Sequence, residues 1–513
     1  MALGGTFVWL QLVRAVEPLA LDQGLFACFG RFVPEGQLPY RDLFDSKPPL
    51  FLYTWVLAWS LGHSVVGVWR FEAVWLALSM GLAGVLVARQ WGRVAGLAAA
   101  ALLFAGLWSP GFGGYWSRAQ AEELAALPLL GAAWLTLRAR ERPGLALWAG
   151  VLCGAAGLYK VPALAVAVAW PLAWLASDGR AAARRCAWFG GGVLAPWLLA
   201  GAWFAAHGAL GDFYQAVFVH QGHYAAIIAP PWGSVLHDFG ATVGRELPAT
   251  LVLAAVGLVG LWRGDRARAW WLTAWLAASV AAVLAQRQLA PYHYLLVVPP
   301  LAVSAAAGVA TLQEALARPA AAGRPLAGAT LVAALALGAW GAPAWQRVYG
   351  LDATHRAGKL AREPYLRRLQ TDRFSTATAE AAGRYLRERT RPGDGILVWG
   401  LSPGIYALAD RHPVTRYPFH KLLLTEAPLS LRVPGLAARR ADFLRRLHAD
   451  PPAYILVGLR DSNPFEPQDS ATSLQSFTEL AGFVERGYTR ERALGHFVLL
   501  RRNDTASASQ PTD

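Results

Sequence analysis

The sequence has little charge and very little cysteine. Only 16% of its 513 residues are Asp, Glu, Lys or Arg, whereas 55% are hydrophobic; soluble globular proteins carry about 25% charged residues. This deficit excludes an ordinary soluble fold for the whole chain. The three cysteines, Cys28, Cys153 and Cys186, are scattered and odd in number, so they predict neither a disulfide framework nor a zinc site. A basic segment followed by a small-residue cleavage site is also lacking near the N-terminus, so no cleavable signal peptide is expected.

Long apolar segments fill the first part of the chain and stop near residue 344. This pattern predicts an α-helical polytopic membrane protein with a C-terminal soluble α/β domain. We expect a transmembrane domain over 1–345, a connecting segment over 346–373, the α/β domain over 374–502 and a disordered tail over 503–513. About eleven transmembrane helices are predicted, at roughly 4–20, 66–88, 94–109, 120–137, 144–158, 161–176, 187–206, 247–262, 270–286, 292–312 and 326–344.

The net charge of +14 comes largely from arginines in short loops between apolar segments. Cytoplasmic loops of membrane proteins carry such an excess, so the charge indicates topology rather than nucleic-acid binding. Residues 48–62 are apolar and aromatic but too short to span, and we expect a helix lying at the outer face. The basic loops then all fall on the cytoplasmic side, with 19–65 and 345–513 periplasmic. These basic loops are 89–93, 138–142, 177–186, 263–268 and 313–325.

The C-terminal region alternates helical and strand patterns. Helices are predicted at 376–389, 440–449 and 473–487, because charged and apolar residues alternate there with helical spacing. Short apolar runs predict strands at 396–400, 453–459 and 496–500. Helices that alternate with short strands indicate a small layered sheet.

The stretch from Asp22 to Pro49 holds several charges between apolar segments. Charged groups beside a bilayer are costly unless they face water or one another. We therefore expect an ordered cap on one membrane face, broken into short rigid pieces by its prolines. The alternative is a solvated connecting loop with ordinary surface acids. The candidate functional residues of this cap are Asp22, Tyr40, Asp42, Asp45 and Lys47.

Further polar residues interrupt or border later apolar segments, and the predicted topology brings them to the same outer face. Acids there could orient or activate an acceptor hydroxyl, and Arg or Lys could hold a phosphate. Each also has a structural interpretation: a marker of a span end, a snorkelling lysine, a partner for a carboxylate such as Glu123, or an aromatic belt. The candidates are Arg118, Glu122, Glu123, Lys160, Arg287, Tyr292 and His293.

Residues 207–246 form a second predicted outer loop. His220 and His223 have i, i+3 spacing, but no acid lies at matching spacing, so a metal site there is a weak hypothesis. An amphipathic surface helix that helps to bind an acceptor or lipid is the favoured interpretation. No cofactor is indicated, and a divalent metal remains possible.

Four segments of the chain form a recognisable set: LDQG, GQLPYRDLFDSKPPLFLY, GLYKVPAL and PYHYLLVVPPLAV. Together they resemble the multi-span glycosyltransferases of the GT-C fold, among them the bacterial protein O-mannosyltransferase-like and aminoarabinose-transferase-like enzymes. The resemblance implies a polyprenyl-phosphate sugar donor, a periplasmic or lumenal active site and an essential acid at Asp22. It also implies a second acid at Glu123 or Glu122 and a lipid-phosphate ligand at Lys160. The family often has two adjacent acids where this chain has Asp22 and Gln23.

The leading hypothesis is a glycosyltransferase of the bacterial inner membrane. It would pass a sugar from a polyprenyl-phosphate carrier to a periplasmic glycan, lipid or protein, with membrane lipids around it and no nucleic acid. The first alternative is a polytopic transporter or lipid-linked-sugar flippase. Transporters place ionisable groups near the bilayer midplane on repeated, broken helices, and neither feature is visible here. The second alternative is an inactive membrane scaffold whose soluble domain binds a partner.

Overall fold

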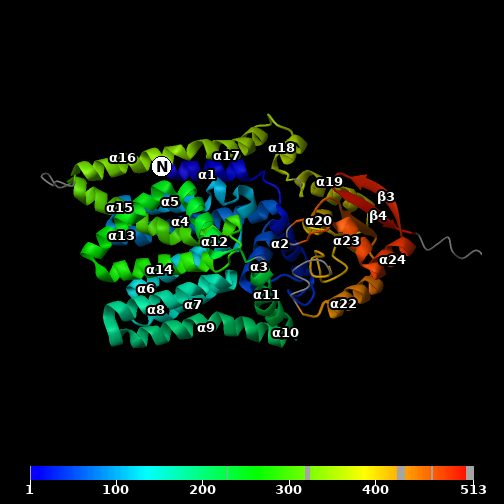
Figure 1. Ribbon diagram of the computed structural model, residues 1–513, viewed down its shortest axis with the longest axis horizontal. Helices are drawn as coiled ribbons and strands as arrows, with labels where there is room; N and C mark the ends of the chain where they lie inside the picture. Colours follow the sequence, from blue (N-terminus) through cyan, green and yellow to red (C-terminus); the bar gives the residue numbers. More distant parts are fainter. Residues whose placement is uncertain are drawn as a thin grey trace, which may run out of the picture.

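In the computed structural model the chain is elongated, with a bundle of helices at one end and a smaller mixed α/β region at the other (Figure 1). The structure describes residues 2–227, 229–317, 324–371, 373–424, 434–463 and 466–503. The predicted disordered tail lies outside this part of the chain, apart from Asn503. The cytoplasmic loop predicted over 313–325 is described only in part.

Helices make up almost all of the chain as far as Arg356. They are α1 (Ala2–Arg14), α2 (Leu21–Phe32), η1 (Val33–Glu35), α3 (Pro49–Ser60), α4 (Val65–Trp91), α5 (Arg93–Leu107), η2 (Pro110–Phe112), η3 (Gly114–Ser117), α6 (Ala121–Arg138), α7 (Leu145–Tyr159), η4 (Val161–Leu164), α8 (Ala165–Asp178), η5 (Gly179–Ala182), α9 (Ala183–Ala206), α10 (Leu210–Tyr214), η6 (Gln215–His220), α11 (Gln221–Ile227), α12 (Trp232–Glu246), α13 (Pro248–Gly264), α14 (Arg266–Leu284), η7 (Pro291–Val297), α15 (Val298–Ala317), α16 (Arg324–Trp340) and α17 (Ala342–Arg356).

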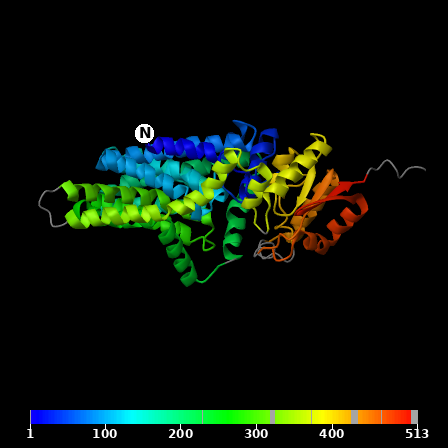
Figure 2. The same ribbon diagram turned by 90° about the horizontal axis from the view of Figure 1, so that it is seen from above.

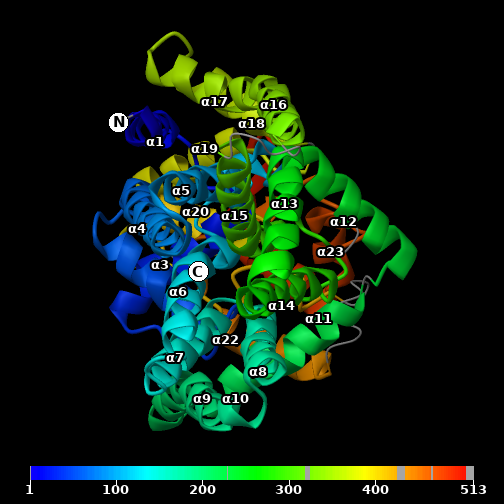
Figure 3. The same cartoon turned by 90° about the vertical axis from the view of Figure 1, so that its left-hand side faces the viewer.

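The apolar segments predicted from the sequence are helical, and the chain is a multi-pass membrane protein. Within the described residues, five helices are long and apolar enough to cross a membrane, or six if the bent pair α12–α13 counts as one span. α5 and α7 are apolar but shorter. The expected count of about eleven crossings stays a prediction. Viewed from the end of the bundle, α15 lies among the other helices, and α16 and α9 lie at opposite edges (Figure 3).

The first predicted span, 4–20, is helical only as far as Arg14. Arg14 is fully buried; its guanidinium donates to Glu17 at 3.1 Å and lies 4.0 Å from the Trp108 ring. A buried arginine requires such partners. The helix ends at Arg14, where Glu17 and Trp108 provide them. α1 therefore has 13 residues, about 20 Å at 1.5 Å per residue, which is short of a hydrocarbon core of about 30 Å.

The segment predicted to lie at the outer face, 48–62, is confirmed as a helix, α3. Pro48 and Pro49 start it, as proline suits the first helical position. Its 12 residues correspond to about 18 Å, too short to span. α4 begins at Val65, close behind the end of α3, and runs toward the end of the bundle that is remote from the α/β region (Figure 1).

The α/β region contains a four-stranded sheet in the order β1-β2-β4-β3, with β1 parallel to β2 and the other pairs antiparallel. Figure 2 shows the sheet at one end of the molecule, opposite the far end of the helical bundle. Its described elements are α18 (Arg362–Leu369), α19 (Thr376–Arg389), β1 (Ile396–Trp399), α20 (Gly404–Ala409), α22 (Leu436–Ala449), β2 (Tyr454–Gly458), α23 (Ser470–Ser476), α24 (Thr478–Gly487), β3 (Tyr488–Leu494) and β4 (Phe497–Arg502).

The three predicted strands are present as β1, β2 and β4, but the sequence reasoning missed β3. The single helix predicted over 473–487 is also wrong, because the chain bends at Phe477 between α23 and α24. Phe477 is fully buried against Trp399 and Phe443. Burial of this ring favours a break that turns its side chain into the sheet core.

The α/β region packs directly on the helices around the first loop. Gly24 of α2 and Gly404 of α20 approach so closely that a Cβ on Gly24 would lie 2.8 Å from the Gly404 Cα. The Phe44 amide donates to the Arg416 carbonyl at 2.8 Å, and Arg416 forms an ion pair with Asp212 at 2.9 Å. The first loop is therefore held between the bundle and the α/β region, as an ordered cap.

Candidate active site

Helix starts and breaks bring polar side chains together at the end of the bundle that faces the α/β region. Asp22 lies in the first turn of α2, Glu122 in the first turn of α6, and Tyr292 and His293 open η7. Lys160 occupies the break between α7 and η4, which Pro162 fixes. Helix N-termini carry partial positive charge, so the ends of α2 and α6 stabilise their carboxylates.

The floor of this cluster is a buried ion pair. The Lys160 Nζ lies 2.7 Å from Glu122 Oε1, and His293 Nε2 lies 3.9 Å from the same oxygen. The Glu122 side chain is completely buried, and Lys160 is its ion-pair partner. A carboxylate has two acceptor oxygens, so Glu122 keeps the capacity to accept a further hydrogen bond.

The rim of the cluster is partly exposed and holds Asp22, Lys47 and Tyr292. Gln120 donates to the Asp22 carboxylate at 3.3 Å, and the Tyr292 hydroxyl is within hydrogen-bonding reach of it. The Lys47 Nζ lies over the Phe26 ring at 5.5 Å. Burial alone would lower the pKa of Lys47, but Asp45, Asp22 and Glu122 outweigh burial, so its pKa is raised. The lysine therefore stays charged beside Asp22.

The other candidates of the first loop shape its backbone. The fully buried Tyr40 donates its hydroxyl to the Lys47 carbonyl at 2.8 Å, which fixes the approach of Lys47. Asp45 accepts from the Ser46 amide at 2.6 Å; burial raises its pKa, and Lys47 offsets this only in part. Asp42 accepts from the Leu38 amide at 2.9 Å. Asp45 borders the cluster, whereas Tyr40 and Asp42 support it from behind.

Arg118 and Glu123 lie in a second, separate network. Arg118 is 1% exposed and donates to Glu17 at 2.7 Å and to both oxygens of Glu72. It also stacks on Trp69 at 4.0 Å. The Glu123 carboxylate accepts from the Ala119 amide at 2.9 Å and faces this network. The structure therefore brings Glu122, not Glu123, to Lys160 and His293, and it gives Arg118 two carboxylate partners.

Arg287 is held at the edge of the same end of the bundle. Its guanidinium donates to the carbonyls of Ala229, at 3.2 Å, and Pro230, and lies 5.0 Å from the Trp232 ring. These contacts fix the segment before α12. Among the described residues Arg287 forms no hydrogen bond or ion pair with Asp22 or Lys160, so it borders the site rather than lying at its centre.

Sequence reasoning missed residues that position the cluster. Gln23 is fully buried, and its amide donates to the carbonyls of Tyr115, at 2.9 Å, and Arg118, at 3.1 Å. A carboxylate could only accept, so an acid at position 23 would lose these bonds. The sequence did hold a clue to this role, because Gln23 stands where the family that the chain resembles often has a second acid. Gln120, by contrast, carried no signal, because nothing in the sequence places it beside Asp22.

The α/β region contributes Lys421 to the border of the site. Its Nζ lies 5.5 Å from the Tyr224 ring and 4.6 Å from the Phe419 ring, and its charge acts on Asp45. His220 stacks on Tyr224 and contacts Phe44 at 5.3 Å. His220 is thus part of an aromatic contact. Across the described residues, no group of three or more His, Cys, Asp or Glu is arranged to hold a metal ion.

Comparison with protein-family models gave no match, and neither did comparison with curated proteins. Solved structures do match. ArnT from Cupriavidus metallidurans bound to undecaprenyl phosphate is 15% identical, with a TM-score of 0.61 over 99% of this chain and 98% of that one. The same protein in the apo state is 16% identical, with a TM-score of 0.60 over the full length of both chains.

The oligosaccharyltransferase of Archaeoglobus fulgidus in the apo form is 14% identical over 85% of this chain and 65% of its own, with a lower TM-score of 0.46. The two ArnT structures cover both the bundle and the α/β region, so the likeness extends over the whole chain. It agrees with the resemblance carried by the four sequence segments. The chain has the GT-C fold of ArnT.

Proposed function

We propose that the protein is a membrane glycosyltransferase that takes a sugar from a polyprenyl-phosphate carrier. The main support for this function is the cluster of polar residues. In it a partly exposed Asp22 lies beside Lys47 and Tyr292, next to the buried Glu122–Lys160 pair. The cluster lies at the end of a bundle with the GT-C fold. One solved structure with this fold is described as bound to undecaprenyl phosphate, which supports a lipid-phosphate donor.

In the proposed reaction an acceptor hydroxyl attacks the anomeric carbon of the donor sugar. The new bond forms from the acceptor oxygen to that carbon, and the bond from carbon to the phosphate oxygen breaks. The lipid phosphate leaves with the electron pair, and the acceptor proton passes to Asp22 as general base. Asp22 suits this role because it is reachable and is oriented by Gln120 and Tyr292.

Lys47 and Lys160 are the proposed ligands of the donor phosphate. Negative charge grows on the phosphate as the sugar leaves, and preorganised cations stabilise it most at that point. Lys47 is the more accessible of the two, whereas Lys160 is 6% exposed and engaged with Glu122. Tyr292 and His293 border the same space. Arg118 is left out of the phosphate set because Glu17 and Glu72 already occupy its guanidinium, and Glu122 replaces Glu123 as the second acid.

The finer assignments follow the same reasoning. We place the protein in the bacterial inner membrane with the active site and the α/β region on the periplasmic side, because the arginine-rich loops mark the opposite end. The proposed division is a transmembrane domain over 1–345, a connection over 346–373 and an α/β domain over 374–502. The acceptor is a periplasmic glycan, lipid or protein, and the sugar is a hexose or pentose. The ionisable groups of the candidate site lie at one end of the bundle rather than along its length, which disfavours a transporter.

The test uses the purified full-length protein with a panel of polyprenyl-phosphate sugars. Wild type should release polyprenyl phosphate from at least one donor when a suitable acceptor is present. Asp22→Asn keeps the shape but removes the basicity, so transfer should fall by a factor of about 10² or more, with donor binding and thermal stability little changed. Turnover near the wild-type rate in Asp22→Asn would rule out the role given to this residue.

A further inference from the structure

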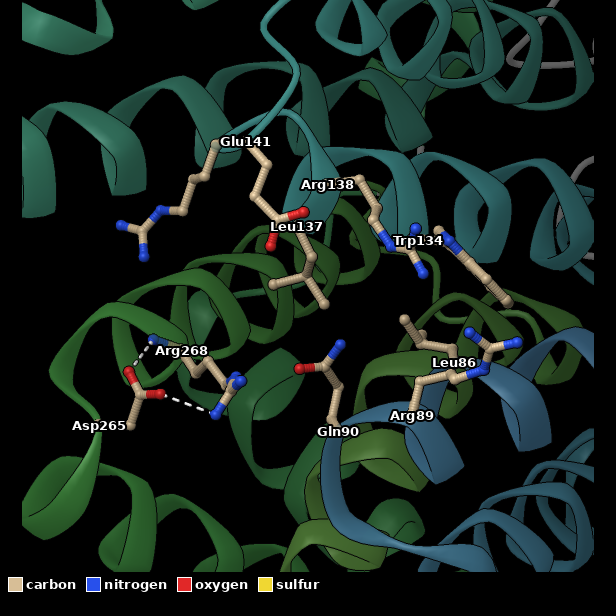
Figure 4. Close-up of a pocket in the computed structure, with 10 residues that line it drawn as sticks. Leu86, Arg89, Gln90, Trp134, Leu137, Arg138, Glu141, Asp265 and Arg268 are labelled. Carbon is tan, nitrogen blue, oxygen red and sulfur yellow. Dashed lines mark hydrogen bonds and ion pairs between the residues drawn. The ribbon is translucent and has the colours of Figure 1, made fainter.

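A polar cavity lies at the end of the bundle remote from Asp22. It has a volume of about 200 Å³ and opens between the C-terminal ends of α4 and α6 and the start of α14. Figure 4 shows its labelled side chains, which come from these three elements and from the turn after α6. The lining of the cavity includes four arginines and two carboxylates: Arg89, Arg138, Arg140, Arg268, Glu141 and Asp265.

Two of the four arginines already have a carboxylate. Arg268 pairs with Asp265 at 2.9 Å, and Arg140 pairs with Asp178 at 2.8 Å. Arg89 and Arg138 form no ion pair with any carboxylate in the part of the chain that the structure describes. Their guanidinium groups lie on the same side of the cavity, beside Trp134 (Figure 4), and Arg138 is 5.8 Å from that ring.

Glu141 is also in no ion pair among the described residues, so the lining has four arginines against two carboxylates, which leaves a surplus of positive charge around a small space. Two guanidinium groups that share one wall repel each other unless an anion lies between them. A phosphate is the anion that a guanidinium binds best, through two parallel hydrogen bonds. The amide of Gln90, which also lines the cavity, could donate to a third oxygen. The positive-inside pattern accounts for arginines at this end of the bundle, but not for their convergence on one cavity.

We propose that this cavity binds a phosphate group through Arg89 and Arg138. The phosphate is carried either by the headgroup of an anionic lipid in the adjacent leaflet or by a soluble molecule. The helix ends that form the cavity are continuous with membrane-spanning segments such as α4, so a headgroup has direct access. The site is separate from the Asp22 cluster, and the proposal does not rest on the proposed function.

The test measures binding to the full-length protein in a neutral detergent. Native mass spectrometry would count phosphatidylglycerol and phosphatidylcholine retained from mixed micelles, and a parallel titration would use inorganic phosphate without lipid. The site variant is Arg89→Gln with Arg138→Gln. Its matched control is Arg142→Gln with Arg180→Gln, which removes the same charge from exposed residues at the same end that do not line the cavity. Arg89→Gln alone, at an exposed position, serves if the double variant does not fold.

The wild type should bind phosphatidylglycerol or inorganic phosphate in preference to phosphatidylcholine. The site variant should bind at least about tenfold more weakly, the loss expected when a charge-assisted hydrogen bond is removed, and the control should change less than twofold. Binding of phosphatidylglycerol without binding of inorganic phosphate identifies a headgroup; binding of inorganic phosphate alone identifies a soluble source. An equal loss in the site and control variants, or no loss in either, would overturn the proposal.

Discussion

At the scale of single residues, the buried Lys160–Glu122 pair is the most consequential contact of the candidate site. The side chains of Lys160 and Glu122 are 8% and 0% exposed, and their charged atoms are 2.7 Å apart. Removal of two charges from water costs several kcal/mol per ion, and only their mutual attraction offsets this. Loss of either partner would leave the other buried and unpaired. The structural alternative for Lys160 in the sequence analysis is a partner carboxylate such as Glu123; in the structure that partner is Glu122.

This pair predicts separable effects on stability and on donor binding. Lys160→Ala should lower the free energy of unfolding by about 3–5 kcal/mol, because Glu122 is left as an uncompensated buried charge. Lys160→Ala combined with Glu122→Gln should recover most of that loss. The measurements are thermal unfolding in detergent and the KM for the lipid-linked donor.

The stable double variant isolates the proposed phosphate role of Lys160. A KM for donor that stays raised in that variant, although stability has returned, supports a direct contact between Lys160 and the donor phosphate. A KM equal to that of wild type would instead make Lys160 a structural counter-ion only. Lys160→Arg keeps the charge and should retain part of the activity.

Neighbouring residues show where sequence reasoning reached its limit. The predicted group of Asp22, Lys160, Tyr292 and His293 is brought together, because breaks and helix starts mark one end of a bundle in the sequence itself. Glu122 and Glu123 could not be told apart. Successive side chains on a helix point about 100° apart, so one faces Lys160 and the other faces the Arg118 network, and only the packing of α6 decides which.

At the scale of elements, the strands with buried side chains were predictable and the exposed edge strand β3 was not. All residues of β1 and β2 are buried, and their apolar runs predicted them. β3 has one buried residue, Tyr488, followed by exposed charged positions. It lies at one edge of the sheet and, among the described residues, pairs with β4 alone. An exposed edge strand commonly carries charge, which discourages pairing with other chains, so apolar patterning cannot reveal a strand like β3. β1 lies at the other edge but is fully buried, and its apolar run did predict it.

Glu466, in the segment between β2 and α23, should make the stability of the fold depend on pH. Glu466 is 2% exposed, and burial raises its pKa to about 7 from an ordinary value of 4.5. The folded state therefore binds a proton that the unfolded state releases between about pH 4.5 and pH 7. Stability should fall as pH rises through this window and level off above it, by an amount on the order of 3 kcal/mol.

Glu466→Gln should abolish this part of the pH dependence, because an amide does not titrate. Thermal unfolding of the two proteins at pH 5 and pH 7.5 would check it, with the variant gaining most at the higher pH. Glu479→Gln, at an exposed position of α24, is the matched control and should behave as wild type. A pH dependence that persists in Glu466→Gln would assign the effect to another group.

At the scale of the whole molecule, the first loop and the α/β region are in contact at one end of the helical bundle. The ion pair of Arg416 with Asp212 and the bond from the Phe44 amide to Arg416 connect these parts. Four of the five predicted basic loops meet at the other end: 89–93, 138–142 and 263–268 share one cavity, and Asp178 links the fourth through Arg140. The arginine distribution thus coincides with one end of the fold, as the sequence had indicated.

This geometry predicts that Ser46 and Arg142 lie on opposite sides of the inner membrane. Cys28 and Cys153 are buried, so a Cys186→Ser background should leave only introduced cysteines reactive. In that background Ser46→Cys should react with a membrane-impermeant maleimide in spheroplasts. Arg142→Cys should react only after the membrane is permeabilised, because basic loops stay in the cytoplasm. Both positions reach solvent, so the comparison depends on sidedness. Labelling of Ser46→Cys from the cytoplasmic side alone would contradict the proposed topology. The candidate site would then face the cytoplasm, and the proposed reaction with a donor in the periplasmic leaflet would be excluded.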